Sequence, residues 1–188
     1  VTNDRKLANK IRALASHGIG TSTLDRQKTK LSWRRDAIYA GYNFRMSNLE
    51  ASIGVEQFKK LDILNEKRIR NAKYLAELLQ GEPEVEFLLA RKEAYHVYQM
   101  FIIKVPASLR DDLVLALRTR GIEASVHFDP PVHAQTFYKK EFGNVNLHQT
   151  LKLAKSVVTL PLFPDMTTQQ IKATADGVKS EIRRLSRK

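Results

Sequence analysis

The chain has 188 residues, 43% hydrophobic and 28% charged, a balance typical of a globular protein and not of a disordered, fibrous or collagen-like chain. It contains no cysteine, which excludes disulfides, thiolate nucleophiles and cysteine-ligated metal sites and is typical of an intracellular protein. The net charge of +12 favours an anionic partner, but the basic residues are spread along the sequence, so we rank nucleic acid below a small anionic substrate. The sequence has neither a membrane-spanning apolar run nor a signal-peptide pattern at its start, so we expect a soluble, cytoplasmic protein with no membrane partner.

The first predicted element is a helix that begins at Asn3 or Asp4, either of which can cap it. Its apolar side chains recur at helical spacing, and His17-Gly18 provides its C-terminal end. Residues 19–40 are polar and basic and show no sustained period. They predict a long exposed loop.

A second helix is predicted to begin at the capping box of Ser47 and Glu50, in which each side chain bonds the other residue's free backbone donor. Its apolar pattern continues to Gly81, about 33 residues along the chain. Because such a helix is longer than a small domain, we expect it to connect two bodies. We place the domain boundary at its end, which gives residues 1–81 and 82–188.

The second part of the chain alternates between strand and helix patterns. The predicted elements are, in chain order, a strand at 97–105, a helix at 108–121, a strand at 122–128, a helix at 147–158, an extended segment at 159–164 and a last helix from Thr167. The first of these strands is apolar on both faces, which is typical of an interior strand. Strands that are each followed by a helix predict a compact α/β or α+β module.

The segment Gly41-Tyr42-Asn43-Phe44-Arg45-Met46 stands directly before the second helix. The backbone donors and the partial positive charge of a helix start favour an anion such as phosphate, and Asn43 and Arg45 add side-chain donors. The alternative is an ordinary helix start in which Asn43 satisfies a turn, and it explains these residues equally well.

Two histidines form the second candidate site. His127 lies on the polar face of the predicted 122–128 strand, and His133 follows the turn Asp129-Pro130-Pro131. Two imidazoles beside a strand end can donate to a diphosphate or transfer protons, although a structural role is the common alternative. The sequence has no histidine pair with the spacing of a zinc site, so we predict no metal. It also has no phosphate-binding glycine loop and no serine elbow, so a standard nucleotide-binding loop and a serine nucleophile are not indicated.

Five stretches of the sequence, in the same order, resemble the DegT/StrS-type nucleotide-sugar aminotransferases. They are Val1-Thr2-Asn3-Asp4, His17-Gly18-Ile19, residues 41–54 (GYNFRMSNLEASIG), residues 121–133 (GIEASVHFDPPVH) and residues 160–164 (LPLFP). The block at 41–54 is the most specific, and the segment at 127–133 is the second. The resemblance extends over almost the whole chain.

The resemblance implies an α/β chain that forms the C-terminal portion of the fold type I transferase fold dependent on pyridoxal phosphate. Residues 1–81 would be the end of the large cofactor domain with the connecting helix, and 82–188 the small C-terminal domain. Such enzymes pass an amino group from an amino acid, usually L-glutamate, to a keto sugar on a nucleotide diphosphate, and they are homodimers with shared active sites.

The family's functional residues carry over at four positions. Asn43 resembles the residue that reaches the cofactor phosphate of the other subunit, and Arg45 resembles a residue that lines the same shared site. His127 and His133 belong to a stretch near the sugar nucleotide. These four are the residues that the resemblance assigns to cofactor and substrate binding.

The family's catalytic lysine is the point at which the sequence departs from the pattern. That lysine forms a Schiff base with the cofactor from a Ser-Phe-His-x-x-Lys-type segment, which would precede Val1, and none of the lysines here has that context. We therefore expect no catalytic residue in this chain, no activity from the chain alone, and a need for an N-terminal half, for which a separate polypeptide is one source. The alternatives are a sugar dehydratase of the same fold, a non-sugar aminotransferase, and a non-catalytic basic module that binds nucleic acid or an acidic partner.

Overall fold

The computed structural model describes residues 2–30, 33–88 and 90–187, so Val1 of the first resembling stretch lies outside it. Contacts divide the chain into two compact units, Val1–Lys59 and Lys60–Lys188. The predicted boundary near Gly81 differs from this division, because the helix before Gly81 packs into the core of the second unit. No helix among the described residues is long and apolar enough to cross a lipid bilayer.

The single long helix predicted from Ser47 to Gly81 is wrong. The structure has two helices there, α3 (Asn48–Phe58) and α4 (Leu61–Leu79), and the chain departs from regular helical geometry at Lys60, with φ −98° and ψ −8°. None of the side chains described in α3 is buried, whereas α4 buries Ala72, Leu75 and Leu79. A continuous apolar pattern therefore covers two helices with different surroundings.

The first unit is built around α1 (Arg5–Ala15), which begins at the predicted cap. The Asp4 carboxylate accepts hydrogen bonds from the backbone N–H groups of Lys6 at 2.8 Å and Leu7 at 3.2 Å. Residues 42–44 then run beside the end of α1, with an isolated bridge between Ser16 and Asn43. In the predicted loop at 19–40, the described residues are largely exposed and include the short helix α2 (Thr23–Gln27).

The described residues of the second unit form an antiparallel sheet of three strands in the order β1-β2-β3. The strands are β1 (Glu86–Phe87), β2 (Phe101–Lys104) and β3 (Val157–Leu160). In register, Phe87 pairs with Ile103, and Ile103 pairs with Val158. The central strand confirms the interior strand predicted within 97–105, although it is shorter than the pattern that predicted it.

Two boundaries predicted for this unit are wrong. The helix predicted at 147–158 is α7 (His148–Ala154), and the residues from Val157 onward form β3 instead. The strand predicted at 122–128 is reduced to a single bridge between Ser125 and Thr159, with N–O distances of 2.9 and 2.8 Å. Alternation of apolar and polar residues is present at 122–128, but pairing extends no further because the chain turns at residues 127–130.

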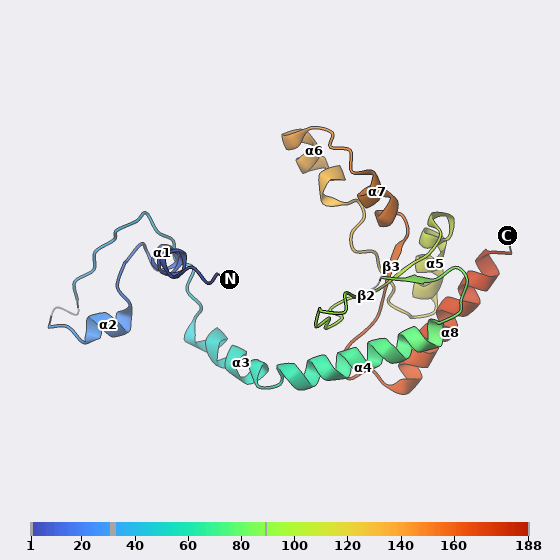
Figure 1. Ribbon diagram of the computed structural model, residues 1–188, viewed down its shortest axis with the longest axis horizontal. Helices are drawn as coiled ribbons and strands as arrows, with labels where there is room; N and C mark the ends of the chain where they lie inside the picture. Colours follow the sequence, from blue (N-terminus) through green and yellow to red (C-terminus); the bar gives the residue numbers. More distant parts are fainter. Residues whose placement is uncertain (1, 31–32, 89, 188) are drawn as a thin grey trace. The chain divides into compact units, whose positions relative to one another are not determined.

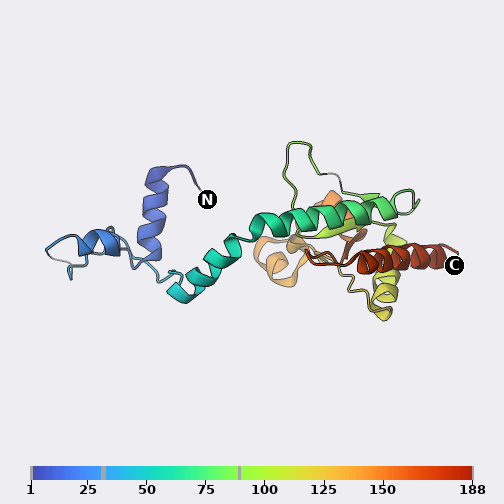
Figure 2. The ribbon, with the colours of Figure 1, turned by 90° about the horizontal axis from the view of Figure 1, so that it is seen from below.

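Three helices and one face of the sheet form the core of the second unit. The helices are α4, α5 (Ala107–Thr119) and α8 (Thr168–Leu185), and α4 and α8 lie side by side in Figures 1 and 2. The fully buried side chains at the centre are Leu75, Leu79, Ile103, Leu113, Leu117, Val158, Leu160, Val178 and Ile182. Because successive strand residues point to opposite faces, Ile102 and Val157 lie on the other face, toward η1 (Val132–Ala134), α6 (Thr136–Phe142) and α7.

Candidate functional site

Two glycines allow the segment before α3 to lie against the turn after α1. Gly18 has a φ of +72°, and a Cβ atom there would lie 1.8 Å from the Tyr39 carbonyl oxygen. A Cβ atom on Gly41 would lie 1.9 Å from the Gly18 nitrogen. Side chains at these two positions would force the two backbone segments apart. The close approach positions residues 42–45 beside the end of α1.

His17, Asn43 and Arg45 form a polar cluster at this contact. The Arg45 Nε donates to the Asn43 Oδ1 at 3.1 Å, and the Arg45 Nη2 lies 3.2 Å from the His17 Nε2. Within the described part of the chain, no carboxylate forms an ion pair with Arg45, and the Asn43 amide nitrogen is left as a donor. An amide and a guanidinium without an acidic neighbour are suited to an anion.

The cluster is followed by the N-terminus of α3, where the predicted capping box is confirmed. Glu50 accepts hydrogen bonds from the Ser47 backbone N–H at 2.8 Å and from the Ser47 hydroxyl at 2.7 Å. These bonds, the backbone one first, lower the pKa of Glu50, so this carboxylate is ionised at neutral pH. Glu50 is therefore engaged by the helix cap.

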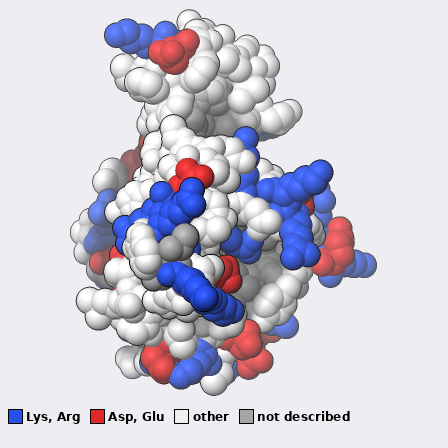
Figure 3. Space-filling view, turned by 90° about the vertical axis from the view of Figure 1, so that its left-hand side faces the viewer, with Lys and Arg blue, Asp and Glu red and all other residues white. Residues whose placement is uncertain are grey.

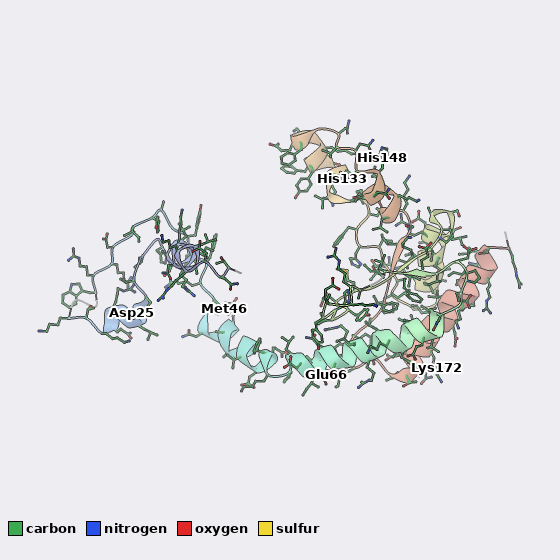
Figure 4. The ribbon with its side chains drawn as sticks, viewed as in Figure 1. Asp25, Met46, Glu66, His133, His148 and Lys172 are labelled. Atoms are coloured by element: carbon green, nitrogen blue, oxygen red, sulfur yellow. The ribbon has the colours of Figure 1, made fainter. Side chains whose placement is uncertain are left out.

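The second unit contains a cavity of about 620 Å³ on the sheet face opposite the core. Its walls come from β2, β3, α6, α7 and residues 127–133, which we call the histidine segment. Most of the lining is apolar, and the polar groups within it include both predicted histidines. Figure 4 shows His133 on the chain that leads into α6 and His148 at the start of α7.

The two histidines of this cavity are held differently. The His127 Nδ1 lies 3.0 Å from the Thr159 hydroxyl of β3, which leaves the Nε2 of this ring for another partner. The His133 Nε2 is buried and has no hydrogen-bond partner among the described residues. A buried ring nitrogen without a partner costs about 1–3 kcal/mol, and a polar ligand group in the cavity would remove that cost.

The four residues predicted as site residues therefore fall into two pairs. Asn43 and Arg45 lie together in the first unit, and His127 and His133 line one cavity in the second. The sequence pattern indicates His17 only as a helix end and does not indicate Thr159 as a site residue. The local sequence has no signal for either role, because both depend on contacts between segments that are distant along the chain.

A family model and three solved structures all relate this chain to aminotransferases. The sequence model of the DegT/DnrJ/EryC1/StrS aminotransferase family matches residues 1–179. Among solved structures, the Helicobacter pylori aminotransferase PseC is 21% identical with a TM-score of 0.85. The match covers 98% of this chain and 48% of the PseC chain. Bacillus subtilis NtdA, solved with bound cofactor PMP, is 26% identical with a TM-score of 0.82. The match covers 97% of this chain and 41% of the NtdA chain.

A putative sugar aminotransferase of Streptococcus pneumoniae, Spr1654 in its PMP form, is 22% identical with a TM-score of 0.85. The match covers 98% of this chain and 47% of the Spr1654 chain. The chain thus spans somewhat less than half the length of these solved structures and shares their mixed helix and sheet fold. Since the family match extends over nearly all of its length, the chain belongs to the DegT/DnrJ/EryC1/StrS aminotransferase family.

Proposed function

We propose that the complete protein containing this chain is a cytoplasmic aminotransferase dependent on pyridoxal phosphate. It moves an amino group from an amino acid, L-glutamate in our proposal, to a keto sugar carried on a nucleotide diphosphate. The observation that carries this proposal is the family match over residues 1–179. The structures of NtdA with bound cofactor PMP and of Spr1654 in its PMP form support the choice of cofactor.

The polar cluster fits the phosphate of this cofactor. Asn43 contributes an amide donor and Arg45 a guanidinium, and no carboxylate of the described residues is paired with that guanidinium. Pyridoxal phosphate, when bound, supplies the electron sink for the chemistry at the amino-acid Cα. In our proposal, Asn43 and Arg45 hold and orient its phosphate in the active site of the partner subunit of a homodimer.

His127 and His133 bind the nucleotide-sugar substrate in this proposal. The two imidazoles provide hydrogen bonds to anionic or hydroxyl oxygens, and the apolar walls of the cavity exclude water from the remaining surface. The unpartnered His133 Nε2 is the group that gains most from a polar ligand. The chain thereby contributes one cofactor-binding and one substrate-binding element.

The proposal is tested on the complete enzyme with two half-reactions. With L-glutamate, the absorbance of the bound cofactor between about 320 and 430 nm should change as the amino group is transferred. UDP- and dTDP-linked keto sugars should then reverse that change and yield amino sugars by mass spectrometry. An enzyme that binds no pyridoxal phosphate would contradict the proposal, and loss of water from the sugar without amination would identify the dehydratase.

The net charge of +12 favours one further candidate, a basic module for nucleic acid or an acidic partner. On the face in Figure 3, Lys and Arg lie in several separate groups, with Asp and Glu beside some of them. Dedicated binders concentrate basic residues on one surface, so we place this candidate second. Salt-dependent binding of arbitrary DNA or RNA by this chain at physiological ionic strength would favour it.

A further inference from the structure

Arg110 is the only Lys or Arg side chain that is buried in the described part of the chain. It lies in α5, and its side chain is 7% exposed. Burial of a guanidinium costs free energy unless a carboxylate compensates it, and an apolar side chain of similar size packs equally well in many proteins. Stability alone therefore does not explain why the Arg110 guanidinium is buried.

The direct partner of Arg110 is Asp129, in the middle of the histidine segment. The Arg110 Nη2 donates to the Asp129 Oδ2 at 2.5 Å. The neighbouring Asp111 carboxylate lies 2.9 Å from the Nε, but without hydrogen-bond geometry, and it is 79% exposed. The contact with Asp129 is thus the one that joins α5 to the histidine segment.

The histidine segment is held from two sides. β3 holds it at its start, through the Thr159 hydroxyl beside His127 and through the bridge from Thr159 to Ser125, two residues before His127. α5 holds its middle through Arg110 and Asp129, two residues after His127 and four before His133. With both contacts in place, the backbone between the two imidazoles is tied to rigid elements rather than left as a free loop.

We propose that Arg110 and Asp129 are positioning residues, which orient His127 and His133 for the nucleotide-sugar substrate without touching it. This inference rests on the proposed function, because it presumes that the histidine segment binds the sugar nucleotide. A displacement of about 1 Å in a positioned group can cost as much as a hundredfold in rate. Loss of the pair should therefore impair the use of the keto sugar and spare the reaction with the amino donor.

The test compares Arg110→Met, Asp129→Asn and Arg120→Met in the complete enzyme. Arg120 is the matched control, because it pairs with the buried Glu181 at 2.6 Å and lies outside the cavity. We expect Arg110→Met and Asp129→Asn to raise the KM for the keto sugar about tenfold, with the rate of the L-glutamate half-reaction unchanged. Arg110→Lys, which keeps the cation but not the guanidinium geometry, should restore part of the affinity lost in Arg110→Met.

The KM values and half-reaction rates distinguish a positioning role of Arg110 and Asp129 from a general structural role. Unchanged KM values in the active Arg110→Met and Asp129→Asn enzymes would overturn the inference and leave the proposed function standing. Equal losses in both half-reactions, or the same KM rise in Arg120→Met, would show a general structural effect and also overturn it. If Arg110→Met does not fold, the partly exposed Asp129 still provides the test through Asp129→Asn. A wild-type enzyme that aminates no keto sugar would contradict the proposed function itself.

Discussion

Replacement of Asn43 by alanine removes one uncharged donor from the polar cluster of His17, Asn43 and Arg45. If Asn43 binds the cofactor phosphate, Asn43→Ala should raise the Kd for pyridoxal phosphate about tenfold, because a hydrogen bond to a charged group contributes about 1.5–3 kcal/mol. Absorbance titration of the complete enzyme measures this. Asn9→Ala is the control, since Asn9 is exposed in α1 and bonds only Arg12 nearby. Equal affinities in the two variants would contradict the assignment.

Glu181 makes the fold sensitive to acid. It is 5% exposed and lies 2.6 Å from both the Arg184 Nε and the Arg120 Nη2. The hydrogen bond from Arg184, followed by the charge of Arg120, lowers the pKa of Glu181, while burial opposes the shift. The stabilisation is therefore complete above the unfolded-state pKa of about 4.3, and it is lost as the pH falls through the lower folded-state pKa.

We expect Glu181→Gln to lower the free energy of unfolding at pH 7 by about 1–2 kcal/mol and to flatten its dependence on pH below about 4. Urea denaturation at a series of pH values measures both effects. Glu86→Gln is the control, because the Glu86 carboxylate that pairs with Lys104 is 72% exposed, and exposed pairs contribute little. A parallel pH dependence in wild type and Glu181→Gln would mean that another group causes the acid sensitivity.

At the scale of elements, α3 and α8 begin with the same capping box but have different surroundings. Ser47 and Thr167 each accept a hydrogen bond from the backbone N–H of the third helical residue. None of the side chains described in α3 is buried, whereas α8 buries eight residues, among them Val178 and Ile182. Local bonds therefore support α3, and tertiary packing supports α8.

Removal of the Ser47 cap should consequently affect only the local stability of α3, whereas removal of the Thr167 cap should affect the stability of the whole second unit. A lost cap costs about 1 kcal/mol, so Ser47→Ala should speed hydrogen exchange across α3 about fivefold without lowering the unfolding midpoint of residues 60–188. Thr167→Ala should lower that midpoint and leave exchange in α3 unchanged. Slow exchange in α3 of the Ser47→Ala chain would mean that the helix is protected by something other than its cap.

At the scale of the whole molecule, buried apolar side chains are concentrated in the second unit. Ala13 is the one buried apolar residue of the first unit among those described, while the core of the second contains Leu75 at 0% exposure. Leu75→Ala should lower the free energy of unfolding of residues 60–188 by about 2–5 kcal/mol. Leu49→Ala, in α3 at 72% exposure, should change it by less than about 0.5 kcal/mol, as measured by urea denaturation. Similar effects of the two variants would contradict this assignment of the core.

Local signals in the sequence were sufficient for the helix starts. Asp4, Ser47 and Thr167 cap helices as predicted, because the bonds of a cap join residues at most three apart in the chain. The resemblance at 41–54 and 121–133 likewise identified the family that the comparison shows. The sequence by itself therefore determined the helix caps and the family, whereas the roles of the two candidate sites stay predictions.

Only the tertiary structure decided where strands pair and which distant side chains meet. Residues 122–128 alternate like a strand, yet one residue pairs with β3, and Val158 belongs to a strand although its spacing fits a helix. His17 meets Arg45, and Arg110 meets Asp129, through separations that no local pattern encodes. Pairing and burial depend on partners far along the chain, and short-range spacing carries no information about those partners.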